Sequence, residues 1–301
     1  MNTINFKHSV IFFNLSIMIT PFYLILDYEP VILCLFLILI IGISHGSLDN
    51  IKGKKLLKLF GYKSRVLFYS IYLIVSLMVI VLWLFFSNTI LLLFLIVAAY
   101  HFGKEDTVFP FRKKFLISEI LFFFKGSAAI IAPLLFQRNE TNEIFDVLNF
   151  YVFKSQIFSD KLLILFLCLS FLSTIYISRN RVSDLKVLMI IDFLSLIILN
   201  FFLTPILAFT IYFCFLHSIR HSIGLIFELD KSFKQGFKKF ISKALPLTLV
   251  TGIMFLIAIY FLNNFYTLDE AIYKVIFIGL ASLTFPHILL EYLLEKNDKR
   301  T

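Results

Sequence analysis

The chain has 301 residues, of which 60% are hydrophobic, and its mean hydropathy is +0.93. Soluble domains are far less apolar, so these values exclude an ordinary soluble protein and indicate a single integral-membrane domain over residues 1–301. The net charge of +9 does not indicate a nucleic-acid partner, because the basic residues lie in short loops between apolar runs.

Ten apolar runs are long enough to cross, or nearly cross, the hydrocarbon layer of a bilayer. In chain order they cover roughly residues 10–26, 30–48, 66–87, 89–103, 115–136, 161–178, 186–201, 203–226, 244–263 and 271–294. We therefore expect an all-α, polytopic transmembrane helical bundle of about ten helices. Eight or nine spans also fit, because three joints could be kinks or re-entrant segments. These joints are the pair Ser87 and Asn88, the stretch from Asn200 to Pro205, and the short fourth run that ends at His101.

Lysine and arginine residues are distributed among the loops as the positive-inside rule predicts for ten helices. Most of the 28 basic residues lie on one side, in the segments 52–65, 104–114, 179–186, 231–243 and 296–300. If that side is cytoplasmic, both termini are cytoplasmic as well. The chain is thus expected to cross a cell membrane many times.

Five of the six histidines fall in the cytoplasmic half of the expected helices, at similar depth. They lie on four runs that cross from outside to inside, and they are His45, His101, His217, His221 and His287. His217 and His221 are four positions apart, so both rings are expected on one face of a helix. Imidazole nitrogens in lipid are costly unless they have a partner, and a metal ion is the first partner to consider. The sixth histidine, His8, is expected at the interface, outside any site.

Carboxylates follow three of these histidines by four positions, and they are Asp49, Glu105 and Glu291. A carboxylate near a metal-binding imidazole fixes its tautomer and raises its basicity, and Asp106 could act in the same way. The same carboxylates could pair with loop lysines instead. Helix packing decides which carboxylate faces which ring.

Further charged residues lie inside apolar runs, among them Lys125, Asp192 and Arg220. Arg220 could reach the cytoplasmic interface or pair with Asp49, Glu105 or Asp106. Lys125 and Asp192 have no assigned partner and could pair with each other.

The 39 phenylalanines are more than packing against lipid requires. Their aromatic faces could line a tunnel for a long polyene or lipid substrate. A compositional bias towards phenylalanine explains them equally well, so both interpretations stay open.

Several neutral imidazoles without a thiolate suit a first-row metal such as iron, copper, zinc or nickel. Iron is favoured if the chemistry involves oxygen, because Fe(II) with four histidine ligands keeps up to two of six positions open. A haem held between pairs of histidines in an electron-transfer protein would use the same residues. So would a proton relay or transporter that combines the histidines with intramembrane acids. Each single histidine could also serve packing alone.

Four short motifs surround these histidines: GISHGSLDN around His45, YHFGKED around His101, FCFLHSIRH around His217 and His221, and FPHILLE around His287. On these motifs, which together span Gly42 to Glu291, the chain resembles the Brp/Blh family of bacterial and archaeal membrane proteins. The members of that family are β-carotene 15,15′-dioxygenases.

The resemblance implies that the chain cleaves the central double bond of β-carotene with O2 at a non-haem iron and releases two molecules of retinal. It places the Fe(2+) ligands at His45, His101, His217 and His221. By the same resemblance, six further residues could surround these ligands or form an additional site. They are His287, Asp49, Glu105, Asp106, Glu291 and Arg220. The implied setting is a bacterial or archaeal plasma membrane, where a carotenoid enters from the bilayer. A retinal-accepting opsin is the implied downstream partner.

Overall fold

The computed structural model describes residues 2–26, 30–62, 64–111, 115–155 and 157–298, apart from a few side chains within these ranges. In this part of the chain every regular element is a helix. The elements are α1 (Asn2–Leu26), α2 (Val31–Leu37), the π-helix η1 (Ile38–Gly42), the 3-10 helix η2 (Ile43–Leu48), α3 (Asp49–Leu59), α4 (Arg65–Glu105), α5 (Phe115–Phe136), α6 (Arg138–Val147), the 3-10 helix η3 (Val152–Lys154), α7 (Asp160–Ser178), α8 (Ser183–Phe202), α9 (Pro205–Ile211), the π-helix η4 (Tyr212–Ser218), α10 (Ile219–Leu229), α11 (Phe233–Leu262) and α12 (Leu268–Asp298).

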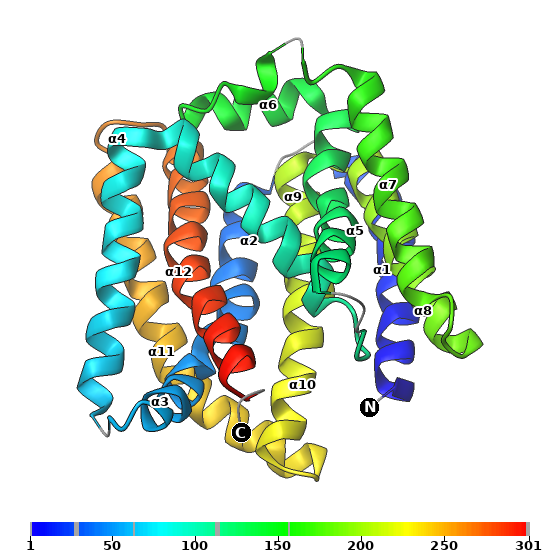
Figure 1. Cartoon of the computed structure of the whole chain (residues 1–301). Coiled ribbons are helices and arrows are strands. Elements are labelled where there is room, and N and C mark those ends of the chain that lie inside the picture. Colours follow the sequence, from blue (N-terminus) through cyan, green and yellow to red (C-terminus); the bar gives the residue numbers. More distant parts are fainter. Residues whose placement is uncertain (1, 27–29, 63, 112–114, 156, 299–301) are drawn as a thin grey trace.

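Seven helical stretches of the described chain are long and apolar enough to cross a membrane. They are α4, α5, α7, α8, the continuous run of α9, η4 and α10, then α11 and α12. α1 is a further helix of 25 residues, and α2 with η1 forms a shorter apolar helix. The expected all-α, polytopic bundle is thus confirmed (Figure 1).

The expected turn at Ser87 and Asn88 is a kink inside one long helix. Phe86 has non-helical backbone angles within α4, with φ −136° and ψ 48°. In Figure 1 the part of α4 before this corner ascends and the part after it runs back down, so the third and fourth expected helices keep opposite directions. Ser87 Oγ donates to the carbonyl oxygen of Asn149 over 2.9 Å. Asn88 Oδ1 accepts from the backbone N–H of Tyr151 over 2.8 Å, so the corner is fastened to the segment after α6.

The second and eighth expected helices are not uniform. The run 30–48 passes from α2 through a π-helix, η1, into a 3-10 helix, η2. The run 203–226 begins as α9 and passes through a second π-helix, η4, into α10. The joint before α9 is a true break, because α8 ends at Phe202 and Pro205 takes the first position of the new helix. Apolar runs of this kind do not reveal a π-helix, which commonly marks a functional site.

Two glycines let α4 and α5 cross at very short range. A Cβ added to Gly103 would lie 1.8 Å from the carbonyl oxygen of Phe122, and one added to Gly126 would lie 1.9 Å from that of Ala99. Only residues without a side chain allow two backbones to approach this closely. Gly103 is two positions after His101, so the crossing also positions the histidine-bearing end of α4.

Four of the elements that carry histidines share one hydrophobic core. Buried members of this core come from η2, α4, η4 and α12, and they include Ile43, Phe102, Leu216 and Ala281. Because these elements pack on the same core, side chains at similar depth on each of them can meet.

The two ends of the bundle differ as the charge distribution predicts. In Figure 1 α3 and the α10–α11 junction lie at the lower end, and α6 lies across the upper end. α1 begins and α12 ends at the lower end as well. This arrangement agrees with the expected placement of both termini on the lysine-rich side.

Candidate metal centre

Four histidines from different elements meet inside the bundle. The ring centroid of His101, from α4, lies 5.2 Å from that of His217, from η4, and 5.3 Å from that of His287, from α12. The centroids of His221, from α10, and His287 are 6.0 Å apart. His101, His217 and His287 are buried, with 6%, 1% and 3% of their surfaces exposed. The structure thus brings together four of the five histidines that the sequence places at similar depth.

The fifth, His45, belongs to η2, and its side chain lies outside the described residues. The backbone of η2 nevertheless contacts both η4 and α10. A Cβ added to the next residue, Gly46, would lie 4.0 Å from Nδ1 of His287 and 4.0 Å from Oδ2 of Asp49. The backbone at His45 is therefore beside the cluster.

The π-helix η4 shapes the part of the site that carries His217. His217 lies near the end of η4 and His221 lies in α10, so the two rings come from one continuous helical run. His8 supports this segment, since its Nε2 bonds to the carbonyl oxygen of Phe215 over 2.8 Å. His8 is thus packed against η4.

Each of three cluster histidines has its Nδ1 bonded to a carboxylate from another element. His217 Nδ1 lies 2.9 Å from Asp106 Oδ1, and His221 Nδ1 lies 3.0 Å from Glu105 Oε2. His287 Nδ1 lies 2.9 Å from both oxygens of Asp49. Asp49, Glu105 and Asp106 were expected near the rings, and the structure shows which ring each one faces.

These contacts set the tautomer of the three rings. An ionised carboxylate only accepts hydrogen bonds, so Nδ1 is the protonated nitrogen and Nε2 carries the lone pair. A metal-binding histidine typically donates its other ring N–H to such a partner, which raises the basicity of the ligand nitrogen. The cluster therefore presents Nε2 as the ligand atom of His217, His221 and His287.

Two buried tyrosines hold two of these carboxylates. Tyr212 Oη donates to Asp106 Oδ2 over 2.6 Å, and Tyr72 Oη donates to Asp49 Oδ2 over 3.0 Å. Sequence analysis missed both tyrosines. Tyr212 stands five positions before His217, which is a weak signal, and nothing in the sequence around Tyr72 indicates its role.

Arg220 is bound away from the histidines, contrary to the partners expected for it. Its guanidinium makes two bonds to Asp192, of 2.6 and 3.1 Å, and one of 2.7 Å to Ser9 Oγ. All three side chains are buried, so Arg220 does not reach the interface either. The pairing of Lys125 with Asp192 that the sequence suggested is not formed. Lys125 Nζ donates instead to Thr107 Oγ1 over 3.1 Å. Arg220 therefore joins α10 to α8 and α1.

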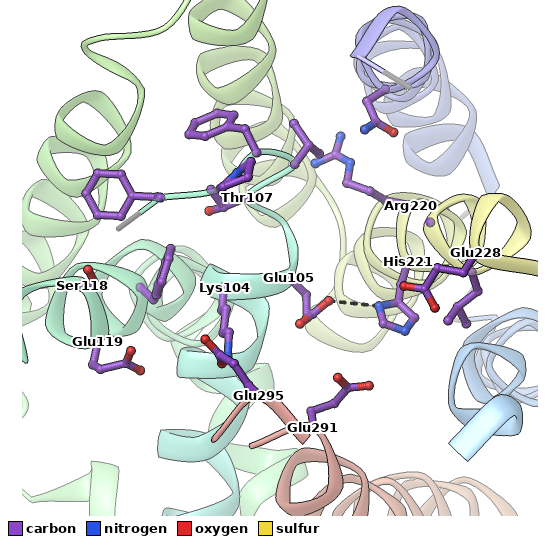
Figure 2. Close-up of a pocket in the computed structure, with 18 of the residues that line it drawn as sticks. Lys104, Glu105, Thr107, Ser118, Glu119, Arg220, His221, Glu228, Glu291 and Glu295 are labelled. Carbon is purple, nitrogen blue, oxygen red and sulfur yellow. Dashed lines mark hydrogen bonds and ion pairs between the residues drawn. The ribbon is translucent and has the colours of Figure 1, made fainter. Parts of the chain in front are cut away.

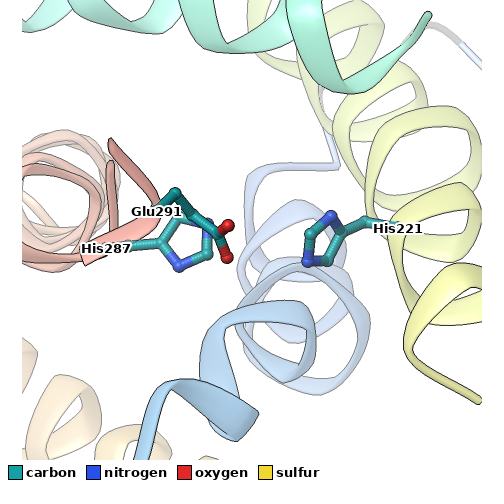
Figure 3. A group of neighbouring side chains, drawn as sticks. All are labelled: His221, His287 and Glu291. Carbon is teal, nitrogen blue, oxygen red and sulfur yellow. The ribbon is translucent and has the colours of Figure 1, made fainter. Parts of the chain in front are cut away.

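Glu291 lies at the edge of the cluster and is ion-paired with Lys52 of α3. The ligand atoms of Glu291, His221 and His287 all lie within 4.8 Å of one another, and Figure 3 shows the carboxylate between the two rings. Burial alone would lower the pKa of Lys52, but the Glu291 carboxylate outweighs it and holds that pKa above its usual value. Lys52 therefore stays charged beside Glu291.

A cavity of about 590 Å³ adjoins the cluster. Its lining includes Glu105, His221 and Glu291 from the cluster, and Lys104, Glu228 and Glu295 from the helix ends (Figure 2). Lys104 and Glu295 form an ion pair of 2.6 Å. Phe109, Phe111 and Phe122 line the same cavity, so its wall is charged beside the cluster and apolar elsewhere.

The cluster fits a first-row metal ion in donor type, and the ligand atoms of His221, His287 and Glu291 are close enough together to share one. Metal–nitrogen bonds of about 2.1 Å place the centroids of two imidazole ligands roughly 5 Å apart. The separations of 5.2 and 5.3 Å around His101 match this value. Neutral imidazoles with carboxylate-bound Nδ1 atoms are ligands that iron, copper, zinc and nickel accept.

Comparison with known proteins gives two matches. A family model described as Beta-carotene 15,15′-dioxygenase matches residues 36–295, a range that includes all five histidines. A protein from uncultured marine bacterium 66A03, described by the same words, is 29% identical over 280 residues. That alignment covers 88% of this chain and 94% of the relative. No solved structure matches.

Proposed function

This chain belongs to the β-carotene 15,15′-dioxygenase family of enzymes, and from that premise we propose that it is a non-haem iron dioxygenase. It would cleave the central 15,15′ double bond of β-carotene, or of a related carotenoid, with O2 and release two molecules of all-trans-retinal. The proposed location is a bacterial or archaeal plasma membrane, in which the apolar substrate already dissolves.

Fe(2+) would be held by His45, His101, His217 and His221, with O2 as co-substrate. When bound, the iron would supply activation of O2 beside the polyene. The protein's own contribution is to hold the ligands in one protonation state and orientation, through Asp106 on His217 and Glu105 on His221.

The observation that carries this proposal is the meeting of histidines from α4, η4, α10 and α12, three of them bonded to carboxylates through Nδ1. Histidines that serve only helix packing have no reason to share this orientation. Membership of an enzyme family also favours an oxygenase over the haem electron-transfer protein and the proton-relay transporter.

A row of nearly parallel aromatic rings ends at His217. We propose that the polyene lies against this row. Phe209 stacks on Phe277 with centroids 6.2 Å apart, and on Phe213 with centroids 5.4 Å apart. Phe213 in turn stacks on the ring of His217 at 5.8 Å. Flat aromatic faces suit a flat conjugated chain, and their end at His217 would set which bond reaches the metal. Retinal released there would pass to a retinal-binding partner such as an opsin.

The test is to express the chain in bacterial cells that accumulate β-carotene and to extract the pigments. We expect loss of β-carotene and appearance of retinal with the unchanged chain, and intact β-carotene with the His217→Ala variant. Retention of β-carotene by cells that contain folded, iron-loaded protein would refute the proposal.

A further inference from the structure

We propose that His287 is an additional ligand of the same metal ion, an assignment that rests on the proposed function. The family resemblance leaves the role of this residue open. Three observations on its position, its orientation and its support carry the assignment.

The position of His287 is central to the cluster. Its ring centroid is 5.3 Å from that of His101 and 6.0 Å from that of His221, so it links two of the proposed ligands. Ligand atoms of His221 and His287 lie within 4.8 Å of each other. A cation bound by His101 and His221 would therefore also be within reach of His287.

The orientation of His287 is that of a ligand. Both oxygens of Asp49 accept from its Nδ1 at 2.9 Å, which directs the protonated nitrogen outward and leaves Nε2 as the donor atom. The residue is only 3% exposed, so protein atoms rather than solvent surround its ring.

The support of His287 repeats that of His217, one of the proposed iron ligands. Tyr212 donates to Asp106, which holds His217, and Tyr72 donates to Asp49, which holds His287. The first unit joins η4 to the C-terminal end of α4, and the second joins α12 and α3 to the N-terminal part of α4. The same support on two histidines of one cluster indicates the same task.

A fifth imidazole has a consequence for the chemistry of the site. An iron ion with six positions and five histidine ligands keeps one position for O2. The polyene would then touch side chains only, and its placement would depend on the aromatic rings near His217.

The experiment measures cobalt binding by purified full-length protein in detergent, after removal of bound metal. Co(2+) reports its ligands through visible absorption bands, so the measurement is independent of oxygenase activity. We expect His287→Ala to weaken Co(2+) binding by about 100-fold or more and to shift these bands, and Asp49→Asn to weaken binding by about 10- to 100-fold. Added imidazole should restore the bands in the Ala variant.

Two matched variants control the measurement. Lys154→Ala removes a partly exposed side chain that pairs with Asp146 of α6, outside the cluster, and it should leave both affinity and bands unchanged. His287→Gln keeps a polar side chain of similar length and serves if the Ala variant does not fold. It should lose affinity as the Ala variant does.

The outcomes separate the two proposals. If the unchanged protein binds neither iron nor cobalt, the proposed function fails and this inference fails with it. If the unchanged protein binds one metal ion and a folded His287 variant binds it with the same affinity and bands, only the inference is overturned.

Discussion

The carboxylate of Asp106 accepts a hydrogen bond of 2.9 Å from Nδ1 of His217, although the two residues are 111 positions apart in the chain. The bond joins the end of α4 to η4 at the depth where the histidines meet. It orients one imidazole towards its neighbours and at the same time ties two helices together. Its removal should therefore weaken metal binding and also loosen the packing of α4 against η4.

Asp106→Asn should weaken iron binding by about 10- to 100-fold, because the amide no longer fixes the tautomer and basicity of His217. Iron content after dialysis against a graded chelator measures this effect. Asp146→Asn is the matched control, since Asp146 pairs with Lys154 at a partly exposed position on α6, and it should keep its iron. Equal iron retention in both variants would contradict the assigned role of Asp106.

Tyr212→Phe should lower thermal stability in detergent, because it removes a donor from a buried carboxylate at a cost of about 1.5–3 kcal/mol. Iron affinity should fall less than in the Asp106 variant, since the carboxylate itself remains. Tyr260→Phe, at a position that is 73% exposed, provides the control and should leave the melting temperature unchanged. If the Tyr212 variant melted at the same temperature as this control, the Tyr212 hydroxyl would contribute nothing to stability.

The buried pair of Arg220 and Asp192 should be structural. Arg220→Met leaves an uncompensated carboxylate and should destabilise the protein by about 3–5 kcal/mol. Adding Asp192→Leu removes that carboxylate and should recover most of the stability, which a melting curve measures. If the double variant is stable and binds iron but cleaves no carotenoid, Arg220 or Asp192 takes part in the reaction instead.

The crossing of α4 and α5 should not tolerate a side chain at Gly103. Gly103→Ala forces a methyl group to within 1.8 Å of a backbone oxygen, so the helices must separate and carry His101 and Glu105 with them. We expect a lower melting temperature together with loss of iron. Gly252→Ala, where an added Cβ meets nothing within 4 Å, is the matched control and should retain both properties.

The sequence was sufficient for the helical bundle and for the similar depth of the histidines, because the length of apolar runs follows directly from the thickness of the bilayer. It could not assign Asp49 to His287, or Arg220 to Asp192, since each of those contacts depends on how distant helices pack. The π-helices were missed for a related reason: an insertion of one residue leaves an apolar run unchanged. Tyr72 illustrates the limit most clearly, because only the fold brings it to Asp49.

The most direct test of central cleavage is the yield of retinal per β-carotene consumed by purified, iron-loaded protein in detergent under O2. We expect two molecules of retinal for each β-carotene and no reaction after the iron is removed. Longer apocarotenals as the main product would contradict cleavage at the central bond. Equal conversion by the iron-free protein would contradict the metal centre itself.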